Sequence, residues 1–237
     1  MYFRTLVLSA FAIAIIAGAM LSIYQAFFIT PIIVGSEVYE VVEAVAHHQA
    51  EVAEAWAPED GVERHSWNFV SNFLLCFAYA LILLSAMSIR TSVNMVKGVF
   101  WGGAAYLTIF VAPALGLPPE IPGMEAAHLE GRQAWWLVTV VLTAISLWLI
   151  AFQNNVYKVL GIILLIIPHI LGAPQPEIHG FANTDPAAVE ALTRLWHDFI
   201  LQTSIANALL WVIIGALSGF IANKLIYSID DKGESHV

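Results

Sequence analysis

The sequence is poor in charged residues and nearly free of cysteine. Asp, Glu, Lys and Arg make up 11% of its 237 residues, whereas a soluble domain has about a quarter. Its one cysteine, Cys76, excludes an internal disulfide and any cysteine-rich metal site. The shortage of charge argues against an ordinary soluble domain.

Sequence signatures of several catalytic and nucleic-acid-binding classes are also missing. We find no Walker A motif, no H-E-x-x-H and no G-x-S-x-G, so P-loop ATP hydrolysis and these hydrolytic centres are not indicated. No basic patch suggests nucleic acid. A haem would need two axial histidines at one depth on facing membrane helices. The only histidines that could serve lie at the outer ends of the membrane-spanning helices predicted below. We therefore expect no enzyme, no tightly bound cofactor and no nucleic-acid partner.

The chain is instead rich in apolar residues, at 59%, gathered in long runs. A membrane-spanning helix needs about 20 mostly apolar residues, with about 17 to 25 tolerated. Six runs qualify: Thr5–Ile33, Trp67–Ile89, Val96–Leu117, Trp135–Phe152, Val156–Ala173 and Phe199–Ile226. The fourth and fifth runs are short, and we expect them to form a helical hairpin about the turn 153–155. The sequence thus predicts an all-α, polytopic protein of the lipid bilayer, one domain over residues 1–237, with six transmembrane helices.

The basic residues predict the orientation of these spans. With six spans alternating, six of the nine basic residues fall on one side, and only Arg64, Arg132 and Arg194 fall on the other. Basic residues flank the cytoplasmic ends of spans. We therefore expect a multi-pass protein of the inner cell membrane with both termini in the cytoplasm.

The outer side then carries most of the acidic residues and every histidine except His236. Such a face attracts cations. Alternatively, carboxylates simply populate translocated loops because they cost little to export. The histidines on the same side favour a cation-collecting face.

Residues 36–57 contain no Gly or Pro and predict an amphipathic acidic outer helix, with Ser36 as its N-cap. Glu43, His47 and Glu51 recur at a spacing of four, so they share one face. They could offer nitrogen and oxygen ligands to a divalent metal. Alternatively, this face is merely solvated on a helix lying at the membrane surface.

A stiff polar stretch, LPPEIPGMEAAHLEGRQAWW, interrupts the apolar runs within an outer loop expected over 116–134. Its prolines hold the chain extended, and helix is expected to restart near Met124. Glu125, His128 and Arg132 would then face one way. Glu125 and His128 are candidate metal ligands. Alternatively, Arg132 pairs with a carboxylate and fixes the loop, with His128 exposed.

Besides the polar stretch, five short motifs along the chain can be compared with known families: TPIIVGSEVYE (30–40), EDGVER (59–64), APALGLPPE (112–120), WLIAF (148–152) and IIPHILGAPQPE (166–177). Together they cover most of the chain and resemble the CbtA family of predicted cobalt-transporter subunits. The resemblance implies an integral-membrane component of cobalt uptake and a small, histidine-bearing CbtB-like partner subunit. It also implies regulation linked to cobalamin supply.

Polar residues at the outer ends of the spans form a further group of candidates. His169 lies near the end of the fifth span, and His197 and Asp198 lie before the sixth, after an outer loop expected over 174–198. Polar side chains are costly in lipid, so they face the bundle interior or water. We favour a divalent-cation vestibule for these three residues over interhelical hydrogen bonding, and hydrogen bonding for Asn72.

We therefore predict a membrane subunit of a divalent-metal uptake system, in which the metal is the transported substrate. Nitrogen and oxygen ligands suit cobalt, nickel, zinc or manganese alike, so cobalt rests on the resemblance. The alternative is a non-transporting scaffold or accessory subunit of a larger membrane complex. Homo- and hetero-oligomers both fit the sequence.

Overall fold

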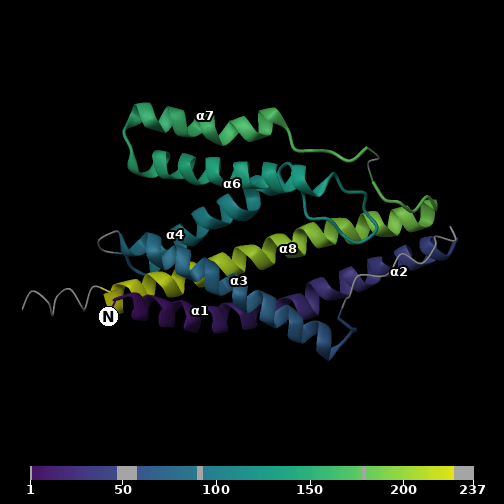
Figure 1. Ribbon diagram of the computed structural model, residues 1–237, viewed down its shortest axis with the longest axis horizontal. Coiled ribbons are helices and arrows are strands. Elements are labelled where there is room, and N and C mark those ends of the chain that lie inside the picture. The colour runs from purple at the N-terminus through teal and green to yellow at the C-terminus, as the bar shows by residue number, and fades with distance from the viewer. Residues whose placement is uncertain (1, 47–57, 90–92, 178–179, 227–237) are drawn as a thin grey trace, which may run out of the picture. The chain divides into compact units, whose positions relative to one another are not determined.

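The computed structural model describes residues 2–46, 58–89, 93–177 and 180–226, and the regular elements in these ranges are helices (Figure 1). The η elements are single π-helical turns. The order is α1 (Tyr2–Tyr24), η1 (Gln25–Ile29), α2 (Thr30–Ala46), α3 (Val62–Ser88), α4 (Met95–Tyr106), η2 (Leu107–Val111), α5 (Ala112–Ala114), α6 (Leu129–Phe152), α7 (Asn155–Leu171), α8 (Pro186–Ile221) and η3 (Ala222–Ile226). The predicted all-α class is confirmed.

Every predicted apolar run forms a helix. In the described residues, five helical segments are long and apolar enough to cross a membrane: Phe3–Tyr39, Val62–Ser88, Met95–Ala114, Leu129–Phe152 and Pro186–Lys224. The remaining run forms α7, which has 17 residues. At about 1.5 Å per residue, α7 is shorter than the roughly 30 Å apolar core of a bilayer. Five spans are thus of full length, and the sixth stays a prediction.

The chain divides into two compact units, which are described separately. Unit 1 comprises Met1–Ala26, Trp56–Gly103 and Ala206–Val237, and unit 2 comprises Phe27–Ala55 and Ala104–Ile205.

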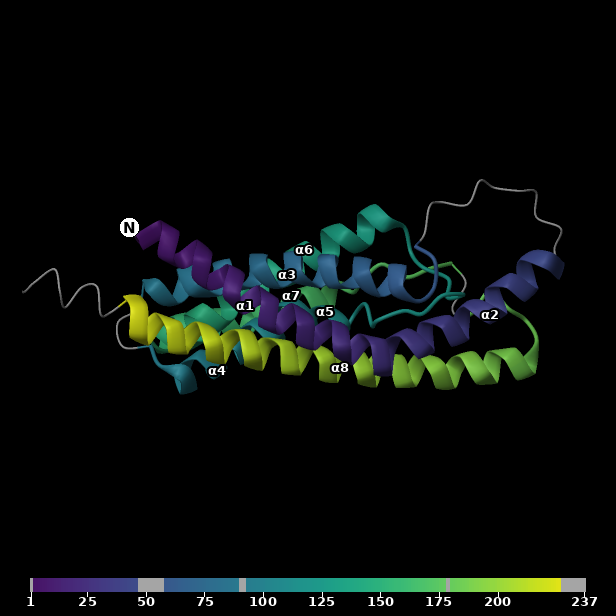
Figure 2. The same ribbon diagram turned by 90° about the horizontal axis from the view of Figure 1, so that it is seen from below.

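In unit 1, α1 and α3 lie alongside each other, as Figures 1 and 2 both show. Small residues on α1 allow this approach, since a Cβ at Gly18 would lie 3.1 Å from the backbone of Phe73. The side-chain amide of Asn72 donates hydrogen bonds to Ser22 Oγ at 2.9 Å and to Gln25 Oε1 at 2.6 Å. Asn72 therefore makes the predicted interhelical hydrogen bonds, which satisfy its polar atoms in an apolar surrounding.

Glycines also bring α4 against the C-terminal part of α8 within unit 1. Gly98 and Gly102 face Gly215 and Gly219, and a Cβ on any of the four would come within 3.0 Å of the facing backbone. Both pairs have the G-x-x-x-G spacing, which lets two helix backbones touch without side chains between them. This spacing was readable from the sequence.

In unit 2, α6 and α7 form an antiparallel hairpin joined by a short turn (Figure 1). Gly161 of α7 packs onto α6, where a Cβ would lie 2.9 Å from the Ser146 carbonyl oxygen. The predicted helical hairpin is therefore present.

Two helices begin earlier than the sequence patterns predict. Ser36 is not an N-cap: it lies inside α2, is fully buried and donates its hydroxyl to the Ile33 carbonyl at 2.7 Å. Helix α8 begins at Pro186, well before Phe199, because Asp185 accepts the Ala187 N–H at 3.3 Å and proline suits the first helical position. Residues 47–57 of the predicted outer helix lie outside the described residues.

We expect Gly98→Ala to destabilise the protein strongly, because its Cβ would collide with the Gly215 carbonyl oxygen. Overpacking of this kind costs about 1–3 kcal/mol or more. Gly103→Ala is the matched control, since its Cβ meets no atom within 4 Å. Thermal unfolding of the purified protein in detergent measures the difference. Equal melting temperatures for the two variants would contradict the close backbone contact.

Candidate functional site

The candidate site is built around the proline strap, which we define as residues 116–125 of unit 2. Two backbone hydrogen bonds attach it to the segment before α8: Glu125 N–H donates to the Gly180 carbonyl at 3.1 Å, and Ala182 N–H donates to the Gly123 carbonyl at 3.0 Å. Gly123 and Gly180 have φ of 83° and 112°, conformations that favour glycine. The two loops are thereby held together.

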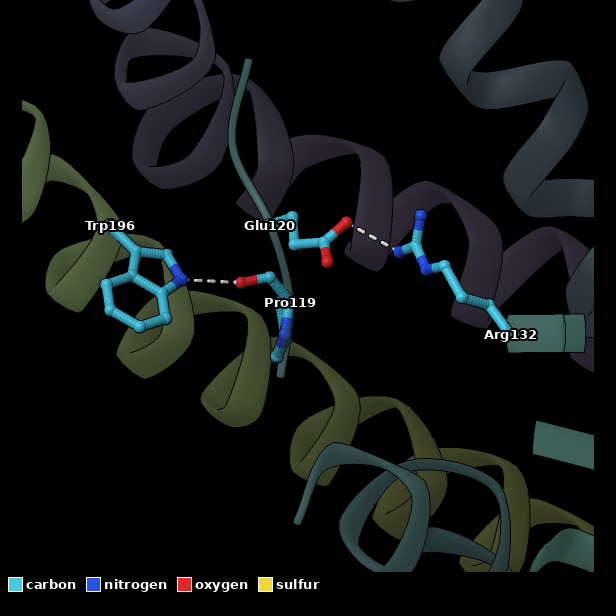
Figure 3. A network of polar contacts seen from close by, with 4 residues as sticks. All are labelled: Pro119, Glu120, Arg132 and Trp196. Atoms are coloured by element: carbon cyan, nitrogen blue, oxygen red, sulfur yellow. Dashed lines mark hydrogen bonds and ion pairs between the residues drawn. The ribbon is translucent and has the colours of Figure 1, made fainter. Parts of the chain in front are cut away.

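Two side chains from different helices hold the centre of the strap. Figure 3 shows Trp196 of α8 on one side of it and Arg132 of α6 on the other. The indole N–H of Trp196 donates to the Pro119 carbonyl at 2.8 Å. Arg132 Nη2 donates to Glu120 Oε2 at 2.5 Å, and the two side chains are only 27% and 25% exposed. The strap therefore connects α6 to α8.

A second tryptophan fixes the start of the strap. A Cβ at Gly116 would meet the ring of Trp135, so only glycine leaves room for the indole. The Trp135 N–H donates to the Pro168 carbonyl at 3.3 Å. Its ring also meets His169 edge-on, with centroids 6.0 Å apart. Helices α6 and α7 and the strap thus meet at one indole.

Two cavities border the strap, and Glu120 lines both. The first, of about 580 Å³, is largely apolar and includes Phe110, Trp136 and Leu137 with Arg132. The second, which we call the acidic cavity, has about 540 Å³. Its polar lining comes from Glu120, Glu125, Gln175 and Thr193, set among prolines 118, 174 and 176.

The predicted helix restart near Met124 is wrong. Residues 124–127 are not helical, and α6 begins at Leu129 with His128 as its N-cap residue. The reason is the pairing of Glu125 with Gly180, which keeps this part of the chain out of the helix. Glu125 and His128 are both exposed and do not share a helix face. Arg132 pairs with Glu120 rather than Glu125.

The other predicted ligands are dispersed. His197 and Asp198 are exposed on α8, and His169 is half-buried in the last turn of α7. Within the described residues, no three or more His, Cys, Asp or Glu side chains come together in a way that could hold a metal. The metal roles of these residues stay predictions.

Three predicted ligands belong to the outer acidic segment. Glu43 lies in α2, but the structure does not describe its side chain, and His47 and Glu51 lie outside the described residues. Their roles also stay predictions.

Glu120 is the residue that the sequence analysis missed as a candidate. Its signal was its place directly after Pro118 and Pro119, since a carboxylate on so rigid a segment has a defined position. Arg132, its partner, was noted in the sequence. That Arg132 pairs with Glu120 could not be predicted, because the pairing depends on the path that the strap takes in the fold.

A known protein family matches most of the chain. Residues 3–223 match the family described as Probable cobalt transporter subunit (CbtA). The chain belongs to the CbtA family. Its five long apolar helices make this CbtA member a multi-pass membrane protein. Neither a curated protein nor a solved structure matches the chain.

We expect Glu120→Gln to lower the stability of this CbtA protein by about 1–3 kcal/mol, because it leaves the half-buried Arg132 guanidinium without its charged partner. Glu190→Gln is the matched control, since it breaks the exposed Glu190–Arg194 pair, whose side chains are 72% and 73% exposed. Exposed helical pairs contribute only about 0.3–0.5 kcal/mol. Melting temperatures of the two variants give the comparison, and a loss no larger for Glu120→Gln would contradict a structural role for the pair.

Proposed function

We propose that this protein is the membrane subunit of a divalent-metal uptake system for cobalt and that it collects the cation on a face rich in carboxylates and histidines. The observation that carries the proposal is the family match over residues 3–223. The acidic cavity, where Glu120 and Glu125 line one space beside the proline strap, supports it. The proposal places this face outside an inner membrane, with both termini in the cytoplasm.

The charges of the acidic cavity suit transient capture better than tight binding. Arg132 offsets the charge of Glu120, so Glu125 is the carboxylate free to attract a hydrated cation. Carboxylate and amide oxygens are acceptable ligands for Co²⁺, and Glu125 and Gln175 are exposed. A transported ion must bind well enough to enter and weakly enough to leave. One uncompensated carboxylate beside a neutralised one meets both requirements.

We propose that the cation next meets His169, His197 and Asp198, which also belong to unit 2. Their imidazole and carboxylate groups would replace water molecules bound to the ion. Trp135 beside His169 limits where that imidazole can point. The family description calls its members subunits, and a small CbtB-like membrane subunit is the partner that we propose.

The proposed function is tested by accumulation of radiolabelled cobalt in cells expressing this chain, with and without the CbtB-like subunit. We expect uptake that depends on the chain and persists in the presence of competing nickel and zinc. An expressed, membrane-inserted chain that gives no uptake with or without the partner would contradict transport. A stable larger complex with no metal on the chain would then favour the scaffold.

The role of the acidic cavity is tested by Glu125→Gln in the same uptake assay. We expect several-fold lower uptake at limiting cobalt, with little change at saturating cobalt, because a capture site acts through local concentration. Glu130→Gln is the control, since Glu130 is exposed nearby in the first turn of α6 but lines neither cavity.

The proposed vestibule is tested by His169→Ala and Asp198→Ala, for which we expect lower uptake at an unchanged amount of folded protein. Unchanged uptake in both would remove the vestibule.

A further inference from the structure

The helices pass between unit 1 and unit 2 at three places within the described residues. These lie at Ala26–Phe27 in η1, Gly103–Ala104 in α4, and Ile205–Ala206 in α8. A fourth crossing, at Ala55–Trp56, lies outside the described residues. A regular α-helix across each boundary would resist bending, since every backbone N–H would be bonded four residues back. Within a few residues of each of the three helical crossings, a feature weakens or departs from that pattern.

The first crossing lies inside a π-helical turn. Boundary 26–27 falls within η1, which ends two residues before Pro31. Proline has no N–H, so one carbonyl in the preceding turn lacks its helical donor. The widened π turn accommodates this loss, and such turns are frequent at functional sites and at helix kinks.

The second crossing lies in regular helix, and a π turn begins three residues beyond it. Helix α4 passes the boundary and is followed at once by η2, which ends two residues before Pro113. The Ala112 N–H donates to the Leu107 carbonyl, five residues back, which is the π-helical pattern. Two separate spans therefore carry a π turn followed by proline close to a boundary between the units.

The third crossing uses hydroxyl groups instead of proline. Thr203 Oγ1 donates to the Phe199 carbonyl at 2.6 Å, and Ser204 Oγ donates to the Ile200 carbonyl at 2.6 Å. These consecutive side chains compete with the backbone N–H groups for two successive carbonyls. Back-bonding by Ser and Thr weakens and often bends a helix. The boundary follows directly at Ile205–Ala206.

We propose that these three turns are hinges, and that unit 1 and unit 2 move relative to each other as two bodies by bending at them. Each unit is held together internally: the glycine contact of α4 with α8 and the Asn72 bonds hold unit 1, and the strap holds unit 2. Motion of two packed bodies about a few helical positions is a recognised form of domain movement.

The motion is tested by distances between spin labels, measured by pulsed electron paramagnetic resonance on the full chain in lipid nanodiscs. The buried Cys76 is first replaced by alanine, and cysteines are introduced at exposed positions. Phe3 in α1 with Ile89 at the end of α3 reports on unit 1, and Leu129 in α6 with Val156 in α7 reports on unit 2. Ile89 with Val156 reports between units. We expect narrow distributions within each unit and a distribution at least twice as wide between them.

A variant that combines four substitutions at the three turns, the straightening variant, then tests whether the turns cause the width of the between-unit distance distribution. Pro31→Ala and Pro113→Ala each add the missing backbone donor, and Thr203→Val and Ser204→Ala remove the competing hydroxyls. We expect the between-unit distribution to narrow about twofold while both within-unit distributions stay unchanged. Thr193→Val is the control, because it removes the same kind of bond, from Oγ1 to the Val189 carbonyl at 2.7 Å, inside unit 2.

A between-unit distribution as narrow as those within the units would overturn the proposal, and so would a width that the straightening variant leaves unchanged. If the combined variant does not fold, the nearly isosteric Thr203→Val carries the test alone, with partial narrowing expected. No metal enters this measurement. A failure of cobalt uptake with a wide between-unit distribution would therefore reject the proposed function and keep the hinges.

Discussion

The hydrogen bond from the Trp196 indole to the Pro119 carbonyl is the contact on which the candidate site depends. A proline-rich segment has carbonyl acceptors but lacks backbone donors where its prolines stand, so much of what holds it in place comes from other elements. Here the Trp196 indole of α8 donates to the Pro119 carbonyl, and the Arg132 guanidinium of α6 donates to the Glu120 carboxylate. Without them the centre of the strap would lose its side-chain anchors, and the two cavities beside it would lose their common wall.

The charge distribution at the strap is the feature that the proposed function uses. Glu120 is committed to Arg132, which both orients the carboxylate and reduces its pull on a cation. Glu125, a few residues along on the same rigid segment, is left exposed. A site that held cobalt tightly would slow its release, whereas a partly neutralised carboxylate pair attracts the ion and exchanges it. Under the proposed function, the strap would thus combine a stiff frame with weak electrostatic capture of the ion.

The sequence predicted the helical class, the positions of the apolar runs, the α6–α7 hairpin and the family, because these depend on composition and on local patterns. The restart of helix at Met124 was wrong because a backbone pairing with Gly180, distant in sequence, overrides local propensity. The partner of Arg132 was equally unreadable, since it depends on the path of the strap. The start of α8 was different: the Asp185–Pro186 signal was present and was overlooked. The metal roles of His169, His197 and Asp198 stay predictions, because local spacing within one helix says nothing of distances between helices.

The glycine contact between α4 and α8 also has a consequence for biosynthesis. Domains generally form as the chain is made, N-terminal parts first, but α4 finds its facing backbone only in the part of α8 that follows Ala206. Until that part has entered the membrane, Gly98 and Gly102 present an unfilled groove to lipid. Unit 1 is therefore completed by a part of α8 that is synthesised long after α4 itself. A nascent chain halted before them would leave α4 without its packing partner and open to quality-control proteases.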